Sequence, residues 1–465
     1  MTRHPLILAS ILWLIALGVA LPPSARALNL DGVLKAAREH DLRYAESGAH
    51  YRVARTALPA ATSAFFPKIQ ANANVAYNDL HNTILGASAF PIPSGTFTFN
   101  SHGYGISLRE TLLDIRALYA YHAAGEGVHA ARLRYQLAAS RLMLGVARRY
   151  FAFLLARDDL RLIHAEERAL HAEYRSALRS FHLGTATIID AHEARARFDT
   201  VRAEGLSAAN TLRIARDRLE RMTGHAVRHV WRLALTKPLP APPRVSLQGL
   251  EARAALQNLV LRAQQAQAHS ASAAASAAQA ARFPTISAEA SYSYEHAGNG
   301  IFGFGSNLRQ KIVGLNLSWP IYQGGELRAA SAKARAQAYG ARLAVLRARR
   351  IVRFDVRRAF LTVHSGYAQI VAFRTAEKAA RVALASDELG ARVGTRNTVD
   401  VLEAEQAYYA ARRDYTRSVY GYLLSRLGLK AAVSHLTPGD IRQLNGLLRP
   451  PRGHRSPRRV APPHP

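Results

Sequence analysis

The sequence predicts a mainly helical protein that also carries a few membrane-facing β-strands. Long stretches repeat apolar residues at helical spacing, and the stretch from Ala117 to Leu183 contains no proline. Short segments instead alternate strictly between apolar and polar residues, which is typical of a strand with one face in apolar surroundings. Both patterns occur twice in the 465-residue chain, which indicates two related halves.

Residues 1–27 are predicted to be a signal peptide. Arg3 and His4 precede an apolar run from Leu6 to Leu21, and Ala25-Arg26-Ala27 is a small-x-small cleavage site. The run is shorter than the ~20 residues that span a bilayer, which favours a cleaved export signal over a membrane anchor. We therefore expect an exported protein.

Composition excludes several classes of chemistry. The absence of cysteine rules out disulfides, thiol nucleophiles and cysteine-ligated metals. No phosphate-binding loop, serine-hydrolase or zinc-protease motif occurs, and His164 and His171 have a helix-face spacing rather than a chelating one. We expect no enzyme activity, no cofactor and no metal site. The net charge of +30 suggests a polyanionic partner or a codon bias toward arginine, but export argues against nucleic acid.

Paired motifs define the two halves. Phe66-Pro67 recurs as Phe283-Pro284, and Leu183-Gly184-Thr185 recurs as Val393-Gly394-Thr395. The predicted units are a signal peptide, a first repeat at 28–244, a second repeat at 245–436, and a C-terminal segment at 437–465 that includes a disordered, basic, proline-rich tail.

Each repeat is predicted to hold two strands. They fall at about 67–78 and 103–112 in the first repeat, and at about 284–295 and 308–319 in the second. Alternating segments of ~10 residues with aromatic ends are typical of outer-membrane barrels. A soluble sandwich alternates in the same way, but four strands among so much helix make a poor sandwich. Pro67 and Pro284 mark entry into the strands, and the exit is marked by Pro320, Gly324 and Gly325.

The remaining segments are predicted to be helices. Tyr408, Tyr415, Tyr422 and Leu429 follow one another at seven-residue spacing, which is typical of a coiled-coil seam. As single helices, residues 117–183 and 327–393 would each reach about 100 Å at 1.5 Å per residue. Helices of that length do not fit a compact domain.

Strand number predicts self-assembly. Four strands cannot close on themselves, and an open sheet edge in lipid leaves backbone groups unpaired at several kcal/mol each. Bacterial barrels have even strand numbers of about eight or more, so two copies or three copies would close one. A water-filled channel requires the larger barrel, which favours three.

Several motifs resemble the TolC family of outer-membrane efflux ducts. The segment Val313–Gly325 (VGLNLSWPIYQGG) is similar to the strand-to-helix passage of that family. The segments Phe181–Thr185 and Val393–Arg396 resemble its two inner hairpin tips, and the likeness covers nearly all of the chain after residue 28. The resemblance implies a homotrimer with a 12-stranded β-barrel, four strands per chain, on a long periplasmic α-helical coiled-coil barrel. It places the protein in the outer membrane of a Gram-negative cell, in contact with outer-membrane lipid.

The same resemblance assigns roles to single residues. Asp400 and Glu403 would form a ring of carboxylates at the periplasmic constriction. Asp190 and Arg396 would form a latch between hairpin tips, and a further tyrosine of the family's lock falls on Ala391. The tips themselves would contact a periplasmic adaptor through Gly184, Thr185, Gly394 and Thr395.

The function implied is an outer-membrane channel of a tripartite efflux or type I secretion system. Its partners would be a periplasmic adaptor (membrane fusion) protein and an inner-membrane RND, ABC or MFS transporter, with no nucleic acid. The alternative is a periplasmic coiled-coil adaptor or another exported structural protein. The sequence leaves the cargo open among drugs, metal ions and a secreted protein.

Overall fold

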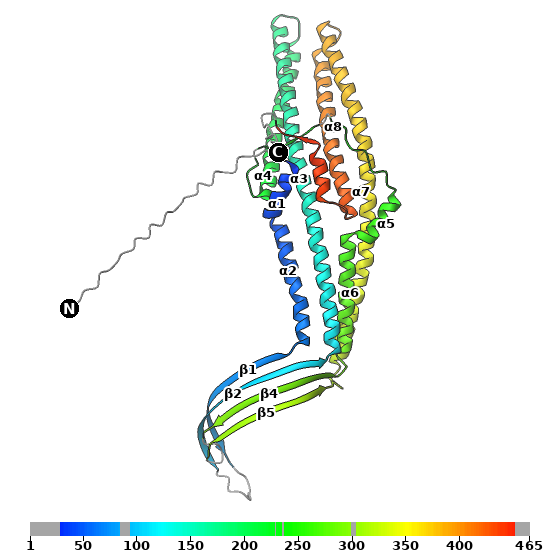
Figure 1. Ribbon diagram of the computed structural model, residues 1–465. Helices are drawn as coiled ribbons and strands as arrows, with labels where there is room; N and C mark the ends of the chain where they lie inside the picture. The colour runs from blue at the N-terminus through cyan, green and yellow to red at the C-terminus, as the bar shows by residue number, and fades with distance from the viewer. Residues whose placement is uncertain (1–27, 84–93, 228, 235–236, 299–303, 452–465) are drawn as a thin grey trace, which may run out of the picture.

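Helices and strands occupy opposite ends of one long molecule (Figure 1). The computed structural model describes residues 28–83, 94–227, 229–234, 237–298 and 304–451. The helices form a column, and four strands leave one end of it as a curved sheet (Figure 1). The predicted signal peptide and the tail from residue 452 onward lie outside the described residues.

The order of elements repeats along the chain. The first half contains α1 (Leu30–His40), α2 (Leu42–Thr62), the short helix η1 (Ser63–Phe65), β1 (Lys68–Asn82), β2 (Gly95–Leu113), α3 (Ile115–His182) and α4 (Ile188–Thr223). The second half contains α5 (Leu247–Gln257), α6 (Leu259–Ala280), β4 (Thr285–Ala297), β5 (Ser306–Ser318), α7 (Glu326–Arg392) and α8 (Thr398–Ala432). After it come α9 (Pro438–Asn445) and β6 (Leu448–Arg449), and β6 pairs with β3 (Arg232–Leu233). The internal order helix, helix, strand, strand, helix, helix thus occurs twice.

The long helices dominate the column. α3 has 68 residues and α7 has 67, so each extends about 100 Å. In each half, two consecutive helices are separated by a single polar residue that caps the second one: α1 and α2 by Asp41, and α5 and α6 by Asn258. Asp41 accepts from the Tyr44 amide before α2, and Asn258 accepts from the Val260 and Leu261 amides before α6. Among the described residues, no helix is apolar over a long enough stretch to cross a bilayer.

The four strands form one antiparallel sheet in the order β1-β2-β4-β5. β2 and β4 are paired at the centre and join the two halves. β2 begins at Gly95, earlier than the 103 expected from the sequence, and β1 continues to Asn82 rather than 78. The predicted start of β2 was wrong because the apolar residues switch faces along this strand. Phe97 and Phe99 lie on the face opposite to Tyr104 and Ile106.

The main core lies in the middle of the column. It gathers side chains from α1, α3, α4, α8 and α9, and its largest fully buried members include Tyr150, Phe151, Tyr422 and Ile441. A smaller cluster between α3 and α6 is built mainly from alanines, including Ala130 and Ala266. Small side chains there allow the two helix backbones to approach closely.

Candidate functional site

One face of the sheet is apolar and exposed. Strand pairing places Ile69 opposite Leu108, and Ala290 opposite Val313. In the single chain, Val75 is 85 % exposed, Val313 87 % and Leu315 76 %. Such a continuous exposed apolar surface marks contact with lipid or another apolar partner. We call it the outward face.

The opposite face of the sheet is polar. Asn72 lies opposite Gly105, and Asn74 lies opposite Gly103. Near the helical end, Arg109 of β2 forms a 2.6 Å ion pair with Glu289 of β4. Asparagine, glycine and paired charges are suited to a water-filled interior.

Both edges of this sheet are open. In the part of the chain that the structure describes, β1 pairs only with β2, and β5 pairs only with β4. Their outer backbone groups cannot be satisfied by lipid, so further strands are needed on both sides.

The predicted entry and exit residues lie at the junctions of sheet and column. Pro67 and Pro284 directly precede β1 and β4, and Pro320 follows β5. Gly324 and Gly325 adopt positive φ of 57° and 89° immediately before α7. Only glycine adopts this backbone without strain, which explains the pair at a sharp strand-to-helix turn. In the first half the strand-to-helix junction has no such glycine pair. There the Asp114 carboxylate caps α3 by accepting from the Ala117 amide.

The hairpins α3–α4 and α7–α8 end in matching turns. Gly184 and Gly394 have φ of 71° and 80°, the left-handed conformation that ends a helix. The Thr185 amide donates to the Ser180 carbonyl and the Thr395 amide to the Gly390 carbonyl, both at 2.9 Å. All four predicted tip residues therefore lie at exposed reversals at the end of the column far from the sheet (Figure 1).

Asp190 and Asp400 occupy equivalent positions after these turns. Asp190 accepts from the Thr187 amide at 2.9 Å, and Asp400 accepts from the Asn397 amide at 3.1 Å. Each closes a capping box at the start of its helix, where a carboxylate also meets the positive end of the helix dipole. Glu403 is exposed one turn further along α8.

Arg396 binds within its own hairpin. Its Nε lies 3.2 Å from Oδ1 of Asp387, and its Nη1 lies 3.9 Å from Oδ2 of Asp400. Among the described residues, Arg396 and Asp190 are not within ion-pair distance, so a link between them stays a prediction for the assembled protein. The sequence reasoning missed Asp387, although an acidic residue in the last turns before a tight reversal is within reach of the arginine that follows it.

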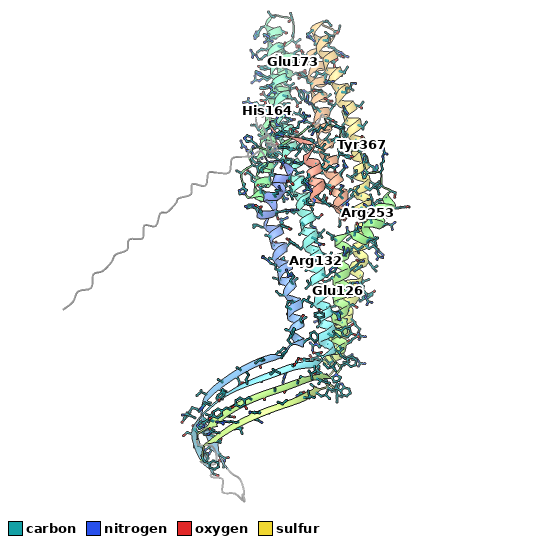
Figure 2. The ribbon with its side chains drawn as sticks, in the orientation of Figure 1. Glu126, Arg132, His164, Glu173, Arg253 and Tyr367 are labelled. Carbon is teal, nitrogen blue, oxygen red and sulfur yellow. The ribbon has the colours of Figure 1, made fainter. Side chains whose placement is uncertain are left out.

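An acidic cluster between the two hairpins, with Glu405 and Glu166 buried, was also missed. Glu405 of α8 is only 6 % exposed, and its Oε2 has no hydrogen-bond partner among the described residues. Burial, together with the nearby carboxylates of Glu173, Glu388 and Glu166, raises the pKa of Glu405 to about 7. Glu173 lies in the half of the column nearest the tips (Figure 2). Glu405 follows Val401, which is also buried, by one helical turn.

An ion pair balances part of the negative charge of this cluster. Arg413 Nη1 lies 2.6 Å from Oε2 of Glu166, which is itself only 3 % exposed. The pair connects α8 with α3. The described residues include no group of three or more His, Asp or Glu side chains that could hold a metal ion.

Comparison with known proteins gives consistent matches. A family model described as outer membrane efflux protein matches residues 33–225 and 250–435. Outer membrane protein TolC of Escherichia coli K12 is 28 % identical over 441 residues, which cover 92 % of this chain and 86 % of TolC. The proteases secretion protein PrtF of Dickeya chrysanthemi is 24 % identical over 424 residues, covering 90 % and 91 % of the two chains. The solved Campylobacter jejuni CmeC outer membrane channel superposes with a TM-score of 0.77 at 16 % identity over 90 % of each chain.

Proposed function

The chain belongs to the outer membrane efflux protein family, and from this premise we propose that it is a passive channel gated at its periplasmic tip. It resides in the outer membrane and extends into the periplasm. It would serve a tripartite efflux or type I secretion system; the family description names efflux, and the name of the PrtF relative gives secretion of proteases. We propose no catalytic role.

The observation that carries this proposal is the amphipathic sheet with two open edges. An apolar outward face and a polar opposite face fit a barrel wall with lipid outside and water inside. Since β1 and β5 each lack an outer neighbour in the described chain, the wall is completed by pairing β5 of one copy with β1 of the next. Three copies would give a barrel of twelve strands, which is wide enough for an aqueous pore.

The helical column would continue this pore through the periplasm. α3 and α7 run its full length, from the sheet to the hairpin tips (Figure 1). Three chains would place six long helices (α3 and α7 of each) and twelve shorter ones (α2, α4, α6 and α8 of each) in a tube of about 100 Å. A tube of that length would let cargo bypass the periplasm.

The hairpin tips would form the gate. We propose that Asp400 and Glu403 of three chains line the closed mouth, where neighbouring carboxylates attract cations. The latch would form when Arg396 exchanges its contact with Asp387 for Asp190 of another hairpin. Exposed pairs of this kind contribute only ~0–1 kcal/mol each, so docking of a partner could open them.

The same tips would dock the adaptor. Gly184 with Thr185 and Gly394 with Thr395 present nearly the same backbone at two places per chain. A trimer would then offer six similar docking points to a periplasmic adaptor, which connects to an inner-membrane RND, ABC or MFS transporter. A periplasmic adaptor role for this chain itself is disfavoured by its exposed apolar sheet.

Reconstitution tests the channel directly. The purified full-length protein, added to one side of a planar lipid bilayer, is expected to give discrete, long-lived conductance steps. Protein that inserts into the bilayer without any conductance would contradict the proposal.

A further inference from the structure

The outward face of the sheet changes character along its length. On β5, the outward positions nearest the column are Leu317, Leu315 and Val313. The next two outward positions, further from the column, are Lys311 and Arg309. Both side chains are exposed. A strand that begins as a lipid-facing surface thus carries two cations on the same face.

Neighbouring strands extend this region into a patch. Lys311 lies opposite Tyr292, and Arg309 lies opposite Tyr294, with its Cζ 5.9 Å from the centre of that ring. On β2 and β4, the His102 and His296 rings are 4.7 Å apart. We call His102, Tyr294, His296, Arg309 and Lys311 the outward basic patch.

The patch lies in the half of β5 that is far from the column. From Leu317 to Lys311 the chain advances six residues, which is about 20 Å along the strand and about 15 Å along the membrane normal at the usual tilt. Tyrosines concentrate at the same level, with Tyr104 and Tyr294 5.2 Å apart, as in the aromatic girdle at a membrane interface. Because the column extends into the periplasm, the opposite end of the sheet faces the outer leaflet.

Within the described part of the chain, Arg309 and Lys311 lack a carboxylate partner, unlike the arginine near the column end of the polar face. Arg109 on the polar face is neutralised by Glu289. In the described residues, no carboxylate lies within 4.0 Å of Arg309 or Lys311. Two acidic side chains do share the outward face: Glu110 at the column end of β2, and Asp79 on β1, which in the proposed barrel belongs to the strand beside β5 of the adjacent copy. Cations facing a membrane are costly unless an anion compensates them.

We propose that the outward basic patch binds the phosphate groups of a phosphorylated glycolipid in the outer leaflet. Arg309 offers a planar guanidinium that suits bidentate phosphate binding. Lys311 adds a second cation two residues further along the same face of β5. The imidazole of His102 supplies a further hydrogen-bond donor, whereas Nδ1 of His296 is hydrogen-bonded to Oδ1 of Asn307 at 2.7 Å. The apolar positions below, from Val313 to Leu317, receive the acyl chains. This proposal rests on the membrane position of the sheet and is independent of the gate.

The test compares three probes on the intact oligomer in detergent. These are a bis-phosphorylated lipid A, the same lipid A without phosphates, and inorganic phosphate, with bound lipid counted by native mass spectrometry. The unchanged protein is expected to bind the bis-phosphorylated form at least tenfold more tightly than the dephosphorylated form. Inorganic phosphate at millimolar concentration is expected not to displace it. Equal binding of both lipids would overturn the proposal, and displacement by phosphate would reduce the patch to a simple anion site.

Variants locate the site. The double variant Arg309→Gln, Lys311→Gln is expected to weaken binding of the phosphorylated lipid by about tenfold. The double variant Lys68→Gln, Arg350→Gln removes the same charge from the polar face of the sheet and from α7, and should bind as the unchanged protein does. Asp79→Asn should not strengthen binding more than twofold. If both double variants lose affinity equally, the total charge and not the patch binds the lipid.

Discussion

Tyr420 of α8 donates a 2.6 Å hydrogen bond to Oδ2 of Asp158 on α3, and both side chains are buried. Oδ1 of the same carboxylate accepts from Arg161 Nη2 at 2.7 Å. The bond connects the two hairpins in the middle of the column. Nearer the tips, the Arg413–Glu166 pair connects them again, and so does a 2.6 Å hydrogen bond from Arg197 Nη1 to Oε1 of Gln406. These contacts hold the halves of one chain together between the middle of the column and the tips.

Removing this hydroxyl should weaken the junction. Tyr420→Phe leaves one buried carboxylate oxygen without its donor, and such a loss costs about 1–2 kcal/mol. The expected result is a lower midpoint of thermal unfolding, measured by circular dichroism. Tyr408→Phe is the matched control, because that hydroxyl accepts from Arg412 at an exposed site and its loss should cost little. Equal effects of the two variants would contradict a special role for the Tyr420–Asp158 bond.

The acidic cluster should make stability depend on pH. The pKa of Glu405 is about 7 in the folded chain and near 4.5 when unfolded, so between these values the folded state holds one more proton than the unfolded state. Stability therefore falls as pH rises from about 4.5 to about 7, by roughly 2 kcal/mol. Glu405→Gln should flatten this part of the profile and raise stability at pH 8, as measured by denaturant titration at several pH values. Glu193→Gln, at an exposed site on α4, is the control and should leave the profile unchanged.

Arg396→Ser should raise single-channel conductance in planar bilayers. The change removes the cation that holds Asp387 and Asp400 and that we assign to the latch, so closed tips lose a link. Arg392→Ser removes the same charge nearby, from a side chain that contacts only the backbone carbonyl of Glu388 in its own turn. Conductance that rises equally in both variants would show a general charge effect and remove Arg396 from the latch.

If the carboxylate ring exists, multivalent cations added on the periplasmic side should block the channel current. Asp400→Asn with Glu403→Gln is expected to abolish block from the periplasmic side, measured as residual current with added trivalent cation. Glu193→Gln with Asp199→Asn removes the same charge from exposed sites on α4, serves as the control and should keep the block. Persistent block in the first double variant would place the ring elsewhere.

Periodic patterns made most of the architecture predictable. The long helices begin and end within two residues of the predicted ranges 117–183 and 327–393, which no proline interrupts. The apolar and polar faces of the strands follow from alternation alone, because a lipid-facing wall imposes a period of two. The end of β1 and the start of β2 were missed because both strands continue beyond the alternating segment. In that part the apolar side chains no longer stay on one face.

The tip was predictable in part. Gly184 and Gly394 lie at the reversals because a helix end needs a left-handed residue, and this is a local property. The partner of Arg396 depends on how two helices pack side by side, so Asp387 could not be chosen from spacing alone. Glu405 was missed for a related reason: an acidic residue at a buried helical position is apparent only when the opposing helices, with Glu173 and Glu388, are in place.

The most direct test of the assembly is closure between β1 and β5. Because the chain has no cysteine, new cysteines report only the intended contact. One cysteine replaces Asn72 on β1, and a second replaces Gln310, Gly314 or Asn316 on β5 in turn, followed by oxidation in the membrane and denaturing electrophoresis. At the matching register we expect a ladder of cross-linked species that ends at three chains. A cross-link confined to one chain, a ladder that stops at two, or one that continues beyond three would contradict a barrel shared by three copies.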